Sequence, residues 1–374
     1  MPEWSPQQDA ALKAVRDWLR NPGGKQWFYL AGYAGTGKTT LAKHLAEGVD
    51  GDVLFGAFTG KAALVLRSKG CEGASTIHSM IYRLDEEGWG GEPRFVLDED
   101  SAAADAALIV IDEVSMVGEE LARDLLSFGT PVLVLGDPAQ LPPVKDAGFF
   151  TEREPDFMLT EVHRQARDNP IIAMSMILRE GGRLKPGRYG DSKVIRPGDV
   201  DRDEVLAADQ VIVGRNVTRR NYNARIRRLL GHEGSLPQRG ERLICLRNNR
   251  VNGLLNGQIW DVAGASFSTV RRGRQVVTVE TDIELQITDE MTGRHVETTA
   301  RAEDFQGVEP DIPWQELKRY DRFDFGYAIT AHKAQGSQWD NVYLFDEGSA
   351  FGADRARWSY TAVTRAAERI TVVV

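Results

Sequence analysis

Residues 27–40 read WFYLAGYAGTGKTT, and this stretch decides the fold. The apolar run at residues 27–30 predicts a buried strand, and Gly32–Thr39 fits the pattern G-x-x-x-x-G-K-[ST]. A helical stretch, residues 39–47, opens directly after the lysine. Glycines in such a loop let backbone N–H groups curl around a phosphate, and the start of the helix adds partial positive charge. A chance glycine turn is the alternative, but the strand and helix on either side favour a phosphate-binding loop.

Short apolar runs alternate with helical stretches along most of the chain. Continuous apolar strands separated by helices predict parallel sheets that are covered on both faces, so we expect an α/β fold. The predicted strands are residues 27–30, 53–58, 108–111, 132–135, 211–213, 341–345 and 370–374, and the predicted helices are residues 39–47, 61–68, 118–126 and 217–230.

Two stretches interrupt this alternation. Residues 79–107 contain the turn-rich run EEGWGGEP followed by an acidic segment. Residues 258–320 contain three strand-like runs, QVVTVETD, IELQIT and RHVETTA, with no helix between them. The second stretch predicts a small antiparallel barrel or sheet inserted into an α/β domain.

Composition excludes several classes of protein. No run of about 18 apolar residues exists, and the first ten residues, MPEWSPQQDA, lack the apolar core of a signal peptide, so we expect a cytoplasmic protein without a membrane span. Two distant cysteines, Cys71 and Cys245, cannot form a cysteine-rich zinc site, and we expect them to be reduced thiols.

The net charge of −9 argues mildly against nucleic-acid binding. Phosphate contacts need only a local basic stripe, however, and residues 215–228 (RNVTRRNYNARIRR) and 239–250 are basic. Solvated helix and loop surfaces would have the same composition, so charge alone leaves both interpretations open.

A second phosphate-site motif is residues 108–116, LIVIDEVSM. The apolar run places Asp112 at the end of a strand, where it can hold Mg²⁺, and Glu113 is suited to act as the general base on the attacking water. In the glycine loop, Lys38 is expected to reach the β- and γ-phosphates and Thr39 to offer its hydroxyl to Mg²⁺. Together these residues predict binding of ATP with Mg²⁺.

Four more motifs follow in order: LGDPAQLPPV at residues 135–144, LTEVHRQ at 159–165, ITAHKAQGSQ at 329–338 and SYTAVTRA at 359–366. With these motifs the chain, from Gln8 to Val374, resembles a superfamily 1 helicase of the 5′-to-3′ class, in its RecD-like and Dda-like branch.

The resemblance implies a role for each matching residue of the nucleotide site. Gln8 would read adenine, Gln140 would couple the γ-phosphate to the strand-binding surface, and Arg164 and Arg365 would reach the γ-phosphate across an interdomain cleft, where guanidinium groups stabilise spreading charge. For each arginine alone, a surface or salt-bridged role is the alternative. The implied nucleotide contacts are Gln8, Gly35, Thr36, Gly37, Lys38, Thr39, Thr40 and Gly336; the implied metal ligands are Thr39 and Asp112.

The same resemblance implies contacts to nucleic acid. Hydroxyl and lysine donors suit phosphate oxygens and read no base sequence, as a motor on any sequence requires. For His78 the alternative is a core or capping role, and for Pro142 it is a simple turn. Trp89 could stack on a base at the tip of a strand-separating hairpin, or it could fold back on its own domain. The candidate contacts are Thr59, Lys61, Thr76, His78, Trp89, Pro142, Thr330, His332 and Lys333.

The resemblance predicts two RecA-like domains with parallel sheets, the first with a short hairpin insert and the second with a small SH3-like β-barrel insert. The expected divisions are residues 1–79 with 108–168, insert 80–107, residues 169–257 with 321–374, and insert 258–320. We expect an ATP-dependent DNA helicase that moves 5′-to-3′ on single-stranded and forked DNA, a monomer without an obligate protein partner. The alternatives are an RNA-directed motor, a small-molecule kinase, and a nucleic-acid clamp with a vestigial ATPase.

Overall fold

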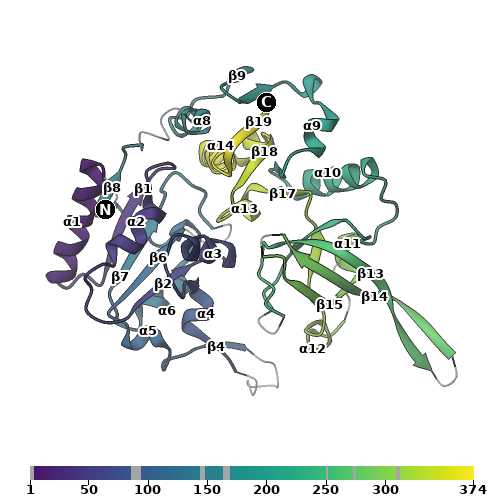
Figure 1. The fold of residues 1–374 in the computed structure, drawn as a ribbon, viewed down its shortest axis with the longest axis horizontal. Helices are drawn as coiled ribbons and strands as arrows, with labels where there is room; N and C mark the ends of the chain where they lie inside the picture. Colours follow the sequence, from purple (N-terminus) through teal and green to yellow (C-terminus); the bar gives the residue numbers. More distant parts are fainter. Residues whose placement is uncertain are drawn as a thin grey trace. The chain divides into compact units, whose positions relative to one another are not determined.

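The computed structural model describes residues 4–85, 94–143, 148–162, 169–249, 252–272, 275–290, 292–308 and 312–374 (Figure 1). Their contacts divide the chain into two units. The first is Met1–Asp201 with Ala334–Val374, and the second is Arg202–Lys333. The predicted division into two domains with two inserts stays a prediction.

A six-stranded parallel sheet forms the amino-terminal part of the first unit, in the order β3-β2-β6-β7-β1-β8. Its central strands are buried at every position, which explains their continuous apolar sequences. The strands are β1 (Trp27–Gly32), β2 (Val53–Ala57), β3 (Ser75–Thr76), β6 (Leu108–Asp112), β7 (Val132–Gly136) and β8 (Phe157–Leu159).

Helices cover both faces of this sheet because its strand residues alternate between two apolar clusters. Leu108 and Val110 of β6 pack with α1 (Pro6–Arg20), α2 (Lys38–Leu45) and α3 (Gly60–Ser68). Ile109 and Ile111 pack instead with α4 (Ile77–Ile81), α5 (Ala102–Asp105) and α6 (Glu119–Leu126), next to the short helix η1 (Val114–Met116). The period of two along a strand therefore produces the layered α/β fold that the sequence predicts.

An antiparallel pair, β4 (Tyr82–Asp85) and β5 (Arg94–Leu97), follows α4. This pair lies where the short hairpin insert is predicted, and the bounds of that insert, residues 80–107, stay a prediction. Trp89 lies outside the described residues, so its predicted role stays a prediction.

The carboxyl-terminal part of the first unit contains a second set of strands. Here β18 (Trp339–Phe345), β19 (Ala366–Val373) and β10 (Ser192–Ile195) pair in parallel, and β9 (Gly187–Tyr189) is antiparallel to β10. Two helices that pack together, α8 (Pro170–Arg179) and α14 (Arg355–Val363), accompany them; the short 3-10 helices are η2 (Pro197–Asp199) and η3 (Gly348–Asp354). The predicted strands at residues 341–345 and 370–374 are confirmed.

The second unit combines a parallel pair with an antiparallel sheet. The parallel pair is β11 (Gln210–Val213) with β17 (Ala328–Thr330), flanked by α9 (Arg202–Leu206), α10 (Asn216–Leu229) and α13 (Ala331–Ala334). The five-stranded sheet has the order β15-β14-β13-β12-β16. Its elements are β12 (Arg242–Cys245), β13 (Ile259–Arg272), β14 (Gln275–Asp289), β15 (His295–Arg301) and β16 (Phe323–Phe325), with α11 (Ala302–Gln306) and α12 (Trp314–Leu317).

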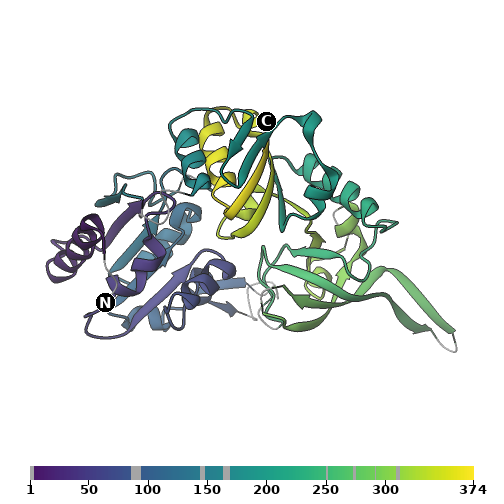
Figure 2. The ribbon, with the colours of Figure 1, turned by 45° about the horizontal axis from the view of Figure 1, so that its top comes forward.

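This sheet confirms the predicted antiparallel structure and corrects it in two respects. The runs QVVTVETD and IELQIT are one strand, β14, because the ladder with β13 jumps from Phe267↔Ile283 to Ser268↔Val279. Residues 280–282 therefore form a bulge within a continuous strand rather than a break. The sheet also includes β12 and β16, which lie outside residues 258–320. The far ends of β13 and β14 pair only with each other and extend beyond the sheet as a two-stranded ribbon (Figure 2).

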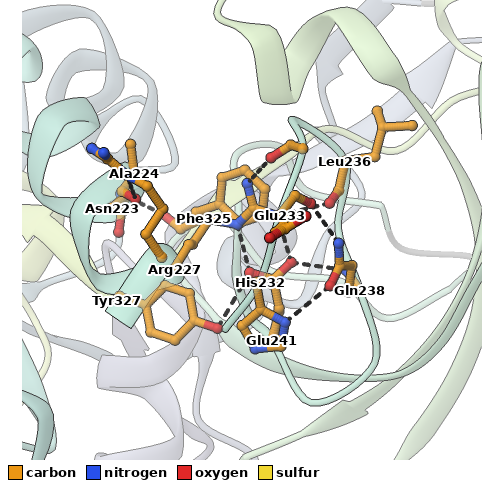
Figure 3. Close-up of polar contacts among 12 residues, drawn as sticks. Asn223, Ala224, Arg227, His232, Glu233, Leu236, Gln238, Glu241, Phe325 and Tyr327 are labelled. Atoms are coloured by element: carbon orange, nitrogen blue, oxygen red, sulfur yellow. Dashed lines mark hydrogen bonds and ion pairs between the residues drawn. The ribbon is translucent and has the colours of Figure 1, made fainter. Parts of the chain in front are cut away.

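A buried ion pair fixes α10 to the antiparallel sheet (Figure 3). The Arg227 guanidinium donates to both carboxylate oxygens of Glu241, at 2.5 and 2.9 Å, and also to the carbonyl oxygens of Gly234 and Leu236. Its Cζ lies 3.9 Å from the centre of the Phe325 ring. Because Arg227 is 5% exposed and Glu241 is 0% exposed, each charge depends on the other for compensation.

Within the described ranges, none of the helices has the length and apolar character that crossing a bilayer would require.

Candidate nucleotide site

The glycine loop joins β1 to α2 and adopts the curled geometry that its sequence predicts. Gly35 and Gly37 have φ angles of 78° and 83°, in the left-handed region that favours glycine. The Thr36 hydroxyl donates to the carbonyl oxygen of Tyr33 at 2.8 Å and closes the loop on itself. A Cβ atom at Gly32 would lie 2.7 Å from the Thr36 hydroxyl oxygen, so the loop has no space for a larger residue there.

The loop lysine lies folded against the loop. Lys38 Nζ donates to the carbonyl oxygens of Gly32, at 2.5 Å, and Tyr33, at 3.0 Å. A bound phosphate can replace these two carbonyl oxygens as the hydrogen-bond acceptor of the Lys38 ammonium group. Thr40 is exposed.

Asp112 and Glu113 lie at the end of β6, beside the start of α2. Asp112 Oδ2 accepts a hydrogen bond from the Thr39 hydroxyl at 2.7 Å, and Asp112 Oδ1 accepts one from the Glu113 N–H at 2.8 Å. Burial, aided by the charge of Glu113, raises the pKa of Asp112 from 3.8 to about 6. Glu113 has φ 56°, the one positive φ of a non-glycine residue in the described part of the chain. Such backbone strain is found at functional sites, where surrounding structure enforces it.

Thr39 and Asp112 together fit a magnesium ion. Mg²⁺ is bound through one or two protein oxygen ligands and the phosphate oxygens of the substrate, with water completing an octahedron. A hydroxyl oxygen and a carboxylate oxygen 2.7 Å apart beside the phosphate loop are a donor set of this kind.

Gln8 packs directly against the glycine loop. Its Nε2 donates to the carbonyl oxygen of Thr36 at 3.2 Å, and its Oε1 accepts from the Ser5 N–H as part of the capping box of α1. The predicted adenine contact stays a prediction, and the structure adds a second role: the buried Gln8 amide ties α1 to the loop.

The loop after β7 contains a site residue that sequence reasoning missed. Asp137 is 2% exposed; its Oδ1 accepts from the Ala139 N–H at 2.9 Å, and its Oδ2 accepts from the Tyr360 hydroxyl at 2.5 Å. Burial raises the pKa of Asp137, while the nearby Lys38 charge lowers it. The signal was available, because Asp137 directly follows one apolar parallel strand and Asp112 is the last residue of another.

Residues of the carboxyl-terminal part hold the same loop at Leu141. The Leu141 N–H donates to the Thr361 hydroxyl at 2.9 Å, and the Leu141 carbonyl oxygen accepts from Gln335 Nε2 at 2.8 Å. Next to it, Gln140 is buried, and its Oε1 has no hydrogen-bond partner among the residues that the structure describes. A buried amide oxygen without a partner is rare, and it suits a side chain held ready for an incoming group.

The two predicted arginines have different outcomes. Arg164 lies outside the described residues. Arg365 is buried, and its guanidinium donates to the carbonyl oxygens of Thr361 and Ser337 and to the Thr364 hydroxyl. In this structure Arg365 is thus bonded to its own part of the fold rather than to the glycine loop, so reaching a γ-phosphate requires it to leave these partners.

The candidate nucleic-acid contacts of the first unit already have structural roles. Thr59 and Thr76 cap the amino termini of α3 and α4. The Lys61 ammonium lies 4.2 Å from the centre of the Trp339 ring, and His78 packs against the rings of Phe58 and Tyr82. Gly336, predicted to contact nucleotide, lies against α3: with φ 72°, its Cβ position is 2.6 Å from the Thr59 hydroxyl oxygen. Pro142 is partly buried after Leu141.

The remaining candidates belong to the second unit. Thr330 is buried at the end of β17 and accepts from the Lys333 N–H at 3.4 Å. Lys333 Nζ donates to Asn256 at 2.9 Å, and burial lowers the pKa of this lysine. His332 precedes it in α13. These contacts to nucleic acid stay predictions.

Comparison with known proteins identifies the family of the chain. Residues 3–199, more than half of the chain, match the family described as AAA domain. The chain belongs to the AAA domain family. Residues 325–373 of this AAA-domain protein also match the UvrD-like helicase C-terminal domain.

Individual relatives agree with this assignment. The chain is 30% identical over 363 residues to the ATP-dependent RecD2 DNA helicase of Deinococcus radiodurans, covering 92% of this chain but only 46% of that protein. It is 32% identical over 185 residues to the ATP-dependent DNA helicase dda of Enterobacteria phage T4, covering 46% of this chain and 40% of that protein. This AAA-domain chain therefore spans about half the length, or less, of these relatives. Its resemblance to superfamily 1 helicases of the RecD and Dda type is confirmed.

A solved structure shares the fold. The Pif1 helicase from Bacteroides in complex with ADP-AlF3 and ssDNA superimposes with a TM-score of 0.54 at 16% identity, covering 100% of this chain and 93% of that one. At this identity the likeness establishes the α/β fold of the AAA-domain chain, with its parallel sheets, and no more.

Proposed function

We propose that this protein is an ATP-dependent DNA helicase that hydrolyses ATP to ADP and phosphate and moves 5′-to-3′ on single-stranded DNA. The observation that carries the proposal is the meeting of Lys38, the Thr39–Asp112 pair and Glu113 at one edge of a parallel sheet. The carboxyl ends of the parallel strands β1 and β6 place these groups there. The direction of movement comes from the resemblance and from no residue in the structure.

Each residue has a part in hydrolysis that follows from its position. The loop N–H groups between Gly35 and Thr39 bind the β-phosphate, and Lys38 leaves its two carbonyl partners for the β- and γ-phosphates. Glu113 orients the attacking water and accepts its proton. Thr39 and Asp112 would hold Mg²⁺, which when bound neutralises charge on the β- and γ-phosphate oxygens.

Hydrolysis is linked to movement through the loop after β7. Residues on either side of the site hold this loop: β7 precedes it, and Gln335, Tyr360 and Thr361 bind it from the carboxyl-terminal part. We infer that the buried Gln140 amide meets the γ-phosphate and that Arg365 completes the pocket when it leaves its present partners. Binding and release of phosphate then change how the amino-terminal and carboxyl-terminal parts bind single-stranded DNA.

The proposal also covers the substrate, the metal, the active form, the location and the domain division. We assign single-stranded and forked DNA as substrates, Mg²⁺ as the metal, a monomer as the active form, and the cytoplasm as the location. The β4–β5 hairpin is the candidate strand separator, and the two RecA-like domains with their inserts are divided as the motifs predict.

The decisive experiment measures ATP hydrolysis with no polynucleotide, with single-stranded DNA and with single-stranded RNA. We expect strong stimulation by DNA, and unwinding of duplexes with a 5′ overhang but not of those with a 3′ overhang. Equal rates with and without polynucleotide would refute a motor. Stimulation by RNA alone would transfer the proposal to an RNA track.

A further inference from the structure

A single hydroxyl group, that of Tyr360, links the glycine loop to the loop after β7. The Tyr360 O–H donates to Asp137 Oδ2 at 2.5 Å, and its oxygen accepts a hydrogen bond from the Ala34 N–H at 2.8 Å. Tyr360 is 1% exposed and lies in the middle of α14. The motif resemblance gives this residue no role, although it lies within SYTAVTRA.

The Tyr360 hydroxyl contacts two loops that border the proposed nucleotide site. Ala34 is the third residue of the loop Gly32–Thr39 and directly precedes the N–H groups that are proposed to bind the β-phosphate. Asp137 lies close enough to Lys38 and Glu113 for both charges to influence its pKa, after burial as the main cause. Lys38 and Glu113 are the groups proposed to meet the γ-phosphate and the attacking water, and Tyr360 is hydrogen-bonded to the carboxylate that senses both.

We propose that Tyr360 makes the site distinguish ATP from ADP: its hydroxyl holds the Ala34 N–H while no γ-phosphate is bound, and a γ-phosphate takes this N–H away from it. This inference rests on the proposed function and deepens it. A charged phosphate oxygen accepts a stronger hydrogen bond than a phenol oxygen, so the exchange favours the nucleotide. The bond from Tyr360 to Asp137 remains in both states.

The exchange reaches the rest of the site through α14. Thr361, the next residue, accepts the Leu141 N–H, and the carbonyl oxygen of Thr361 holds the Arg365 guanidinium. When Ala34 releases Tyr360, α14 loses its one described hydrogen bond to the glycine loop. Arg365 lies two residues beyond the end of this helix, and it can follow the γ-phosphate once it also leaves Thr361, Ser337 and Thr364.

Nucleotide binding to the full chain tests this role directly. In Tyr360→Phe the aromatic ring remains but the Ala34 N–H has no competing acceptor. Affinity for the ATP analogue AMP-PNP should rise about 3- to 10-fold, the worth of one hydrogen bond, while affinity for ADP changes less than about 2-fold. Tyr360→Leu also lacks the hydroxyl and should shift the AMP-PNP-to-ADP ratio in the same direction.

Tyr29→Phe is the matched control. Tyr29 is 0% exposed, and burial together with the nearby Asp137 charge raises its pKa, but its hydroxyl has no hydrogen-bond partner among the described residues. The same chemical change near the same carboxylate should leave the ratio unaltered. An unchanged or lowered ratio in both Tyr360 variants, or the same rise in Tyr29→Phe, would overturn the inference.

Steady-state kinetics provide a second test of the role of Tyr360. In Tyr360→Phe the KM for ATP should fall because ATP binds more tightly. The DNA-stimulated kcat should also fall, because binding of the γ-phosphate no longer triggers the release of α14 from the glycine loop. A rise in KM would count against the inference. A wild-type protein that binds both nucleotides without DNA-stimulated hydrolysis would refute the proposed motor. The binding ratio would still decide the role of Tyr360.

Discussion

Replacing Asp112 by asparagine should stabilise the nucleotide-free protein at neutral pH, although it removes a residue of the proposed site. Asp112 is 4% exposed, and burial with the charge of Glu113 raises its pKa from 3.8 to about 6. The folded protein thus binds this proton more tightly than the unfolded chain does. The stability that the proton bound to Asp112 adds to the folded protein is fully present below about pH 4 and is lost as the pH rises through about 6.

The magnitude follows from the size of the shift. About two pKa units correspond to roughly 3 kcal/mol, which is what the ionised Asp112 costs the folded protein above about pH 7. In Asp112→Asn that cost disappears. An amide also keeps both hydrogen bonds, because its N–H₂ can donate to the Thr39 hydroxyl and its carbonyl can accept from the Glu113 N–H.

Urea unfolding of wild type and Asp112→Asn at several pH values, without nucleotide or Mg²⁺, measures this difference. We expect the variant to be more stable by roughly 1–3 kcal/mol near pH 8, with the gain disappearing near pH 4. Asp105→Asn, which removes an exposed carboxylate, is the control and should show no such trend. ATP hydrolysis by Asp112→Asn should be lost. A variant that is less stable than wild type by the same amount at every pH would refute the reasoning.

Three further substitutions test the site and the fold. Lys38→Ala should abolish ATP hydrolysis while DNA binding, measured by fluorescence anisotropy, stays near wild type; loss of both would place Lys38 in the strand interface instead. Arg365→Ala should lower kcat by about 10³-fold with little change in the KM for ATP, as for other arginines that meet a γ-phosphate, and a wild-type rate with DNA present would remove it from the site. Arg227→Met should lower the free energy of unfolding by roughly 3–5 kcal/mol in urea titrations, because it leaves the Glu241 charge buried and uncompensated. The double variant that also has Glu241→Leu should recover part of this loss, and a double variant no better than the single one would contradict the electrostatic cause.

Much of the fold could be predicted because it depends on local patterns. The strands β1 and β7 are apolar along their length, β6 is apolar up to Asp112, and helices precede or follow them, which is typical of parallel sheets. The glycine loop could be predicted from its spacing. The sequence predicts two separate runs where the structure has one strand, β14, because the bulge at residues 280–282 is visible only in the pairing with β13.

The site was predictable only where a motif is continuous in sequence. Tyr360 and Asp137 are 223 residues apart, and neither sequence context indicates the other. The hydroxyls of Thr59 and Thr76 were predicted to contact DNA, and the structure shows that they also cap helices, a role that depends on where α3 and α4 begin. Long-range pairing and helix boundaries are properties of the folded chain, and one sequence does not contain them.

The Arg227–Glu241 pair also decides which way α10 faces. One helical turn earlier, Asn223 donates to the carbonyl oxygens of Phe325 and Ala328 and accepts the Ala328 N–H. Two inward anchors four residues apart prevent the helix from rotating about its axis. The arginines at positions 220, 225 and 228 must then point outward, as their exposure shows. In a chain with an excess of acidic residues, these three arginines form a basic surface on α10. The buried Arg227 sets the direction in which that surface faces.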